Sequence, residues 1–196
     1  LMESDASCGA ASPLIVRMGD PSLVDFCGGM IDWERIDTVR PKGREDMELF
    51  LTTYAERITA VGTALMLRVA TVKQIGKLDD RLFAYYEDDD FGARLIESGW
   101  RTRVVTNAEI EHACFEGDMY QRPPYFFYLM TRNAFFFALR HAPATYRRAL
   151  KLKFIDRSLV MAEKLLQQAQ PEKADACLLG LADALRGRGG APVLNR

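Results

Sequence analysis

The feature that most constrains the fold is a change of character at the proline pair Pro123-Pro124 of this 196-residue chain. Residues 125–170 contain no glycine and a single proline, which is typical of helices rather than of strands joined by turns. We expect two or more helices there, the first strongly aromatic and a later one, over residues 149–168, mixed basic and apolar. A last short helix is predicted over residues 172–185.

Before the prolines, turn residues divide the chain into short apolar segments, as expected for strands and helices in alternation. The predicted elements are extended segments around residues 13–16 and within 24–33, a short helix over 69–75 ended by Gly76, a helix from Phe91 closed by Gly99, and strands over 101–106 and 108–112 separated by a turn at Asn107. The sequence therefore predicts an α/β domain over residues 1–122 and a helical subdomain over residues 123–196.

Composition and charge exclude several classes of protein. A hydrophobic fraction of 48% with 27% charged residues is ordinary for a globular protein and excludes a disordered chain. The net charge of −1 provides no overall positive field, so we expect no nucleic-acid partner. Cys8, Cys27, Cys114 and Cys177 are too far apart for a structural zinc site or a disulfide framework, which favours a reducing cytoplasm.

The longest apolar stretch, Tyr125 to Leu139, is interrupted by Arg132 and Asn133 and is shorter than the roughly 20 residues that a membrane-spanning helix needs. It is followed by basic residues, which leave two interpretations open. The aromatic helix packs within the protein, or it lies against an anionic membrane surface as a peripheral contact.

The acidic run Glu87-Asp88-Asp89-Asp90 is the strongest candidate for chemistry, because four neighbouring carboxylates repel one another unless something offsets their charge. The positive end of the helix dipole provides such an offset, and a solvated helix start is the simplest interpretation. A cation or a substrate hydroxyl is the alternative. The run is not a calcium loop of the EF-hand type, because the glycine and the final glutamate of that loop are missing.

His112 ends the last predicted strand, where it is either a structural histidine or a metal ligand. The other histidine, His141, is expected at a helix end or on the surface. A metal hydrolase built on the acidic run would need a second cluster of ligands, and the sequence offers none.

The order of these motifs resembles the second half of family 2 glycosyltransferases, most closely the rhamnosyltransferase-like and galactofuranosyltransferase-like branches that make bacterial surface polysaccharides. The resemblance spans roughly residues 5–190, with Leu78 where the family has phenylalanine. The motifs that carry it are Gly62-Thr63-Ala64-Leu65-Met66-Leu67-Arg68, the segment Ile75 to Phe91 with its acidic run, Arg94-Leu95, Gly99-Trp100, His112, Arg132-Asn133 and the ending Gly180 to Gly189.

The resemblance implies the second half of a glycosyltransferase A-type mixed-sheet domain, followed by a helical C-terminal subdomain. It implies inverting sugar transfer from a nucleotide-diphosphate sugar to a glycan or lipid-linked glycan acceptor, with Asp88 as the general base. Glu87 and Asp90, with Gly62 and Thr63, then belong to the substrate site. His112 corresponds to a family ligand of the divalent cation, Mn²⁺ or Mg²⁺, that stabilises the leaving diphosphate.

One departure from the family is an absence. No Asp-x-Asp metal motif lies before Gly62, so we expect this chain to lack the donor-binding half and to be inactive by itself. The rival interpretation is a non-catalytic, truncated glycosyltransferase-like module that docks on a membrane or a partner. The expected location is the cytoplasm, with the inner membrane as a peripheral site.

Overall fold

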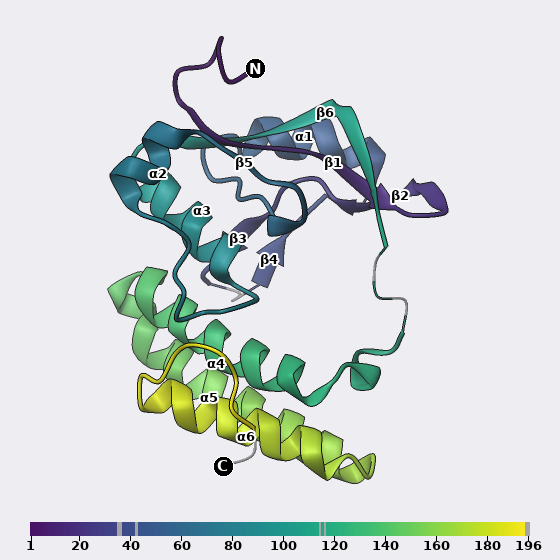
Figure 1. Ribbon diagram of the computed structural model, residues 1–196, viewed down its shortest axis with the longest axis vertical. Coiled ribbons are helices and arrows are strands. Elements are labelled where there is room, and N and C mark those ends of the chain that lie inside the picture. Colours follow the sequence, from purple (N-terminus) through teal and green to yellow (C-terminus); the bar gives the residue numbers. More distant parts are fainter. Residues whose placement is uncertain (35–36, 42, 114, 116, 195–196) are drawn as a thin grey trace. The chain divides into compact units, whose positions relative to one another are not determined.

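The computed structural model describes residues 1–34, 37–41, 43–113, 115 and 117–194 (Figure 1). The chain forms two compact units. The first, called here the sheet unit, comprises Leu1–Leu78 and Asp88–Phe115, and the second, the helical unit, comprises Asp79–Glu87 and Glu116–Arg196. The α/β class predicted from the sequence, with a mixed sheet followed by helices, is confirmed.

The sheet unit is organised around strand β1 (Cys8–Arg17), which pairs with every other strand of its sheet. Strands β2 (Asp20–Phe26) and β5 (Met66–Leu67) are antiparallel to it, and β6 (Arg101–His112) is parallel to it. Leu14, Ile15 and Val16 are all buried, as is typical of a strand covered on both faces. A separate two-stranded sheet contains β3 (Met30–Asp32) and β4 (Asp37–Val39).

Helices α1 (Arg44–Thr53), α2 (Val69–Ile75) and α3 (Glu87–Glu97) complete the sheet unit, apart from Glu87 itself. Phe91 and Leu95, four residues apart on α3, pack with Ala10 of β1 in one apolar cluster. Gly76 and Gly99 follow α2 and α3 with φ values of 86° and 84°. The two predicted glycine helix ends are therefore confirmed, because such left-handed backbone is easiest for glycine.

Two sequence predictions in the sheet unit need correction. Residues 101–112 form one continuous strand rather than two strands separated by a turn at Asn107. A register shift lies there instead, because Pro13 pairs with Val105 and Leu14 with Glu109, so three residues of β6 are skipped. Helix α1 was not predicted, although Met47, Phe50, Leu51 and Tyr54 recur at helical spacing and pack into two apolar clusters of the sheet unit.

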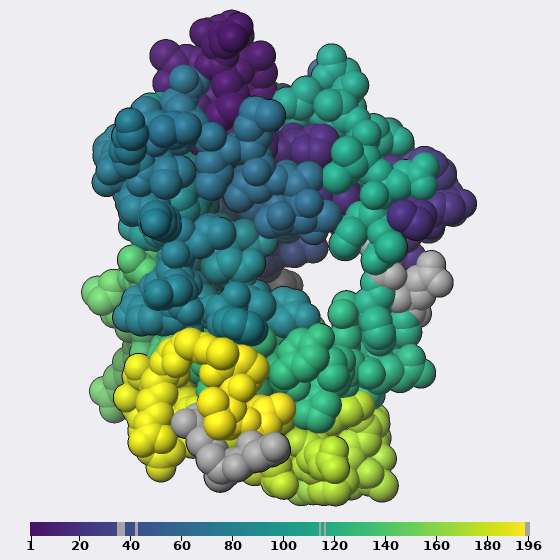
Figure 2. Space-filling view, in the orientation of Figure 1, coloured from purple at the N-terminus to yellow at the C-terminus, as the bar shows by residue number. Residues whose placement is uncertain are grey.

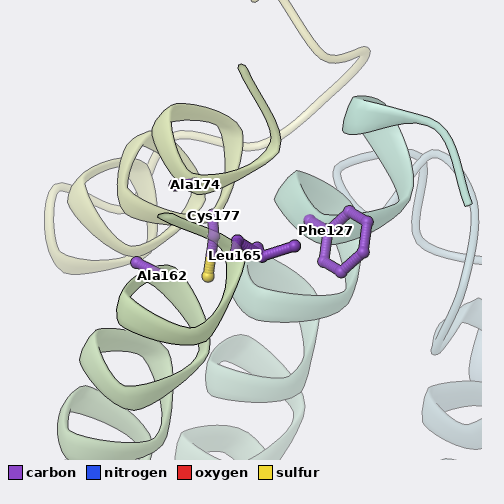
Figure 3. Close-up of a cluster of buried hydrophobic side chains, with 5 residues drawn as sticks. All are labelled: Phe127, Ala162, Leu165, Ala174 and Cys177. Carbon is purple, nitrogen blue, oxygen red and sulfur yellow. The ribbon is translucent and has the colours of Figure 1, made fainter. Parts of the chain in front are cut away.

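The helical unit contains α4 (Pro124–His141), α5 (Ala144–Gln167) and α6 (Pro171–Leu185). Proline occupies the first turn of α4 and of α6, where its missing N–H costs nothing. Figure 3 shows one cluster of the core, to which all three helices contribute, and it consists of Phe127, Ala162, Leu165, Ala174 and Cys177. The helices predicted after the proline pair are confirmed. Within the described part of the chain, no helix is both long and apolar enough to span a lipid bilayer.

Helices α4 and α6 approach each other closely at Gly180. A Cβ atom at this position would lie against the carbonyl oxygen of Tyr128 and only 3.1 Å from its Cα. The absence of a side chain therefore allows main chain to pack against main chain.

Gly180→Ala should lower the free energy of unfolding by about 2 kcal/mol, because two helix backbones cannot move apart without loosening the core between them. Urea unfolding followed by circular dichroism measures this difference. The control is Asp175→Ala on the exposed side of the same helix, which should change stability by less than about 0.5 kcal/mol. Equal effects of the two variants would contradict the close approach.

Candidate functional site

The Asp88 carboxylate is held by two main-chain amides. Its Oδ2 accepts a hydrogen bond from the Gly62 N–H at 2.7 Å, and its Oδ1 accepts one from the Asp89 N–H at 2.9 Å. Gly62 begins the short 3-10 turn Gly62–Ala64, so this glycine-led segment and the start of α3 meet at one carboxylate. The structure thus brings together two residues that the sequence assigned to one site, and leaves Asp88 half-buried and oriented.

The other predicted substrate residues lie around this carboxylate in different settings. Asp90 is buried, and its Oδ2 accepts from Arg94 Nε at 2.8 Å in an ion pair within α3. Arg94 also donates to the carbonyls of Ile75 and Lys77, so this pair joins α3 to the end of α2. Thr63 is exposed and Glu87 is half-buried. Substrate contacts by Glu87, Asp90, Gly62 and Thr63 stay predictions.

The backbone immediately before the acidic run is unusual. Phe83, Tyr85 and Tyr86 have φ values of 63°, 66° and 70°, which are left-handed conformations that non-glycine residues rarely adopt. Each costs on the order of 1–3 kcal/mol and persists only where the surroundings enforce it. This backbone was not predictable, because the segment has aromatic residues where glycine or asparagine would signal it.

The segment starts at an anchored carboxylate, Asp79. Arg81 donates to both of its oxygens, and Arg140 of α4 donates to Oδ2 at 3.0 Å. The hydrogen bond from Arg81 lowers the pKa of the Asp79 carboxyl most, and the charge of Arg140 lowers it further, so that this pKa is about 2 instead of the usual 3.8. Partial burial of the carboxyl acts in the opposite direction.

His112 lies at the end of β6 and contacts Asp25 of β2, with Nδ1 2.9 Å from the carboxylate Oδ2. Donation from Nδ1–H to this carboxylate selects the tautomer with its lone pair on Nε2, the form that binds a metal ion. Sequence reasoning missed Asp25, because 87 residues separate it from His112 and only the pairing of both β2 and β6 with β1 brings them together. The role of His112 as a metal ligand, which the resemblance implies, stays a prediction.

His112 and Asp25 together provide only part of a metal-binding site. In the ranges described above, no group of three or more His, Cys, Asp or Glu side chains is placed to hold one, and Cys114 lies outside those ranges. His112 and Asp25 are a pair rather than a complete ligand set.

Comparison with known proteins shows similarity over a short part of the chain. No protein-family model matches the chain. Over 51 residues the chain is 41% identical to the N-acetylglucosaminyl-diphospho-decaprenol L-rhamnosyltransferase of Mycobacterium tuberculosis, in both strain CDC 1551 / Oshkosh and strain ATCC 25618 / H37Rv. The match spans 26% of this chain and 17% of each relative. It supports the glycosyltransferase-like character that the motifs indicated.

Asp79→Asn should destabilise the protein at pH 7 by about 1 kcal/mol, because the carboxylate loses its charge but the site is screened by solvent. A carboxyl whose pKa is lowered on folding contributes stability above its unfolded pKa of about 3.9, and this contribution disappears as the pH falls through about 2. Urea unfolding of both proteins at pH 7, 4 and 2.5 should show the difference shrinking toward the acid end. If the difference in free energy of unfolding between the two proteins did not depend on pH, the lowered pKa of Asp79 would be contradicted.

Titration of this chain with Mn²⁺ in a calorimeter should show no micromolar binding, because two protein ligands hold a divalent ion weakly. Asp25→Asn is the control, since it removes one member of the pair. Micromolar binding that Asp25→Asn abolishes would show that the chain completes a metal site on its own.

Proposed function

We propose that this chain is the catalytic-base part of an inverting glycosyltransferase. It would transfer a sugar from a nucleotide-diphosphate sugar to a glycan or lipid-linked glycan during synthesis of a bacterial surface polysaccharide. The observation that carries the proposal is the Asp88 carboxylate, held at the start of α3 by the Gly62 and Asp89 amides. The short match to a rhamnosyltransferase and the family resemblance of the surrounding motifs support the same conclusion.

The proposed reaction needs a base that faces the anomeric carbon. An acceptor hydroxyl donates its hydrogen bond to Asp88 and attacks the anomeric carbon of the donor sugar. The proton moves to the carboxylate as the new glycosidic bond forms, the bond to the diphosphate oxygen breaks, and the nucleoside diphosphate leaves. Each carboxylate oxygen has two lone pairs, so accepting from a main-chain amide still leaves room for the acceptor hydroxyl.

The resemblance supplies the remaining roles. Glu87, Asp90, Gly62 and Thr63 are proposed to contact the substrates, with Asp90 acting through a carboxylate that also pairs with Arg94. For the leaving diphosphate we propose a divalent cation, Mn²⁺ or Mg²⁺, with His112 as one ligand. Asp25 would orient the imidazole, and the coordination would have to be completed by groups beyond this pair.

The class of acceptor suggests where in the cell the protein acts. The relatives are named for a substrate in which a diphosphate joins N-acetylglucosamine to decaprenol, a lipid. We propose a lipid-linked acceptor of this general kind for this protein. The sugar transfer would then take place in the cytoplasm, at the surface of the inner membrane. Basic residues on the exposed side of α5 suit a peripheral contact with anionic lipid, and they include Arg147, Arg148, Lys151 and Lys153.

Asp88→Asn should lower kcat by roughly 10²-fold or more and leave donor binding nearly unchanged, because the amide keeps the shape but cannot accept the proton. The measurement is sugar transfer by the protein of the longest natural reading frame that contains this chain. Asp80→Asn is the matched control, since Asp80 is an exposed carboxylate eight residues earlier. Full activity of Asp88→Asn would overturn the assignment of the base.

A further inference from the structure

We propose that Arg132 and Asn133, neighbours on α4, are positioning residues for the catalytic carboxylate. They hold the left-handed segment that leads directly into Glu87 and Asp88, and so fix the direction in which the chain enters the acidic run. The inference rests on the proposed role of Asp88 as the base. It concerns the main chain of residues 81–85, called here the clamped segment.

Asn133 binds the clamped segment through its side-chain amide. Its Nδ2 lies 2.8 Å from the carbonyl oxygen of Leu82, 2.8 Å from that of Ala84 and 2.9 Å from that of Tyr85. The Oδ1 of the same side chain accepts from Arg132 Nε at 2.9 Å, which fixes the amide with its N–H groups toward the carbonyls. Asn133 is fully buried, so no water competes for these bonds.

Arg132 binds the same segment from beside Asn133. Its Nη2 donates to the carbonyls of Arg81 and Leu82, each at 3.1 Å, and its Nη1 donates to the carbonyl of Gly190 at 2.7 Å. Gly190 in turn donates its N–H to the Arg81 carbonyl at 2.6 Å. The segment after α6, yellow in Figure 2, thus lies on the surface of the helical unit and contributes to the same network.

The charge of Arg132 is offset inside the helical unit. The guanidinium is fully buried and lies 5.0 Å from the centre of the Tyr128 ring. Its Nη1 also donates to the Tyr128 hydroxyl, which donates to the buried Asp183 carboxylate at 2.6 Å. A buried cation is costly unless it is paired and hydrogen-bonded, so the network as a whole is needed to keep Arg132 in place.

The clamp explains why the left-handed backbone persists. Phe83, Tyr85 and Tyr86 would relax to ordinary conformations in a free loop, but the carbonyls on both sides of Phe83 are bound to Asn133. Tyr85 and Tyr86 also pack against Phe126 and Phe137 of α4, with ring centres 5.4 Å and 5.6 Å apart. The main chain is therefore held in a single conformation within the helical unit up to Tyr86, two residues before Asp88.

The first test needs no activity and uses the chain itself. Asn133→Leu keeps the volume but removes the donors, so hydrogen exchange of the main chain over residues 79–90, followed by mass spectrometry, should accelerate about 10-fold or more. Phe127→Leu is the control, because it loosens the core between α4, α5 and α6 without touching the clamp. It should accelerate exchange in the helices rather than in residues 79–90.

A milder variant keeps the test decisive if Asn133→Leu does not fold. Tyr128→Phe removes one hydroxyl that Arg132 and Asp183 share and preserves the packing, and it should accelerate exchange of residues 79–90 by several-fold. Unchanged exchange of residues 79–90 in a folded variant would overturn the clamp. So would an acceleration spread evenly over the helical unit.

The second test links the clamp to Asp88 in the protein of the longest natural reading frame. Asn133→Leu should lower kcat about 10-fold with the KM for the donor unchanged, because a misdirected base affects the chemical step. Added to Asp88→Asn, it should cause little further loss, since no base is left to position. Losses that multiply in the double variant would overturn the positioning role. Full activity of Asp88→Asn alone would instead remove the proposed base, and the exchange result would stand apart from it.

Discussion

The carbonyl groups of residues 81–85 need donors inside the helical unit, and the arrangement of that unit follows from the two side chains that provide them. Arg132 and Asn133 both project from α4 into the same buried space. Arg132 brings a charge with it, which calls for Tyr128 and, through Tyr128, for Asp183 on α6. Gly180 on α6 matters for the same reason, because the two helices have to approach closely at Tyr128 for this chain of contacts to form. A main-chain requirement thus explains polar residues in an otherwise apolar core.

Much of the fold was predictable from sequence because its signals are local. The loss of glycine and proline after Pro124 predicted the helices, and glycine at positions 76 and 99 predicted where two helices end. The class and the acidic helix start followed from the same kind of signal. Helix α1 was missed although its apolar residues have helical spacing, whereas the unbroken β6 depends on its pairing with β1, which its own residues do not signal.

The candidate site divides in the same way. Asp88 and Gly62 were predicted by motif, and the structure adds the hydrogen bond that joins them. The contact of Asp25 with His112 could not be predicted, because a single aspartate in a strand has no recognisable sequence pattern, and only the folded sheet places it beside His112. The left-handed conformations of Phe83, Tyr85 and Tyr86 were hidden too, since aromatic residues are poor indicators of such a backbone. Arg132 and Asn133 stood out in the sequence only as one of the motifs that resemble the glycosyltransferase family. Their hydrogen-bond partners lie about fifty residues earlier in the chain, so the sequence alone could not identify them.

The clamp contacts main-chain oxygens, and this leaves the side chains of the clamped segment open to change. Phe83 is 59% exposed, and neither Arg132 nor Asn133 depends on its ring. An exchange of Phe83 for asparagine or glycine would even suit its left-handed backbone. Substitutions can therefore vary the surface beside the acidic run while the path of the main chain through residues 81–85 is kept.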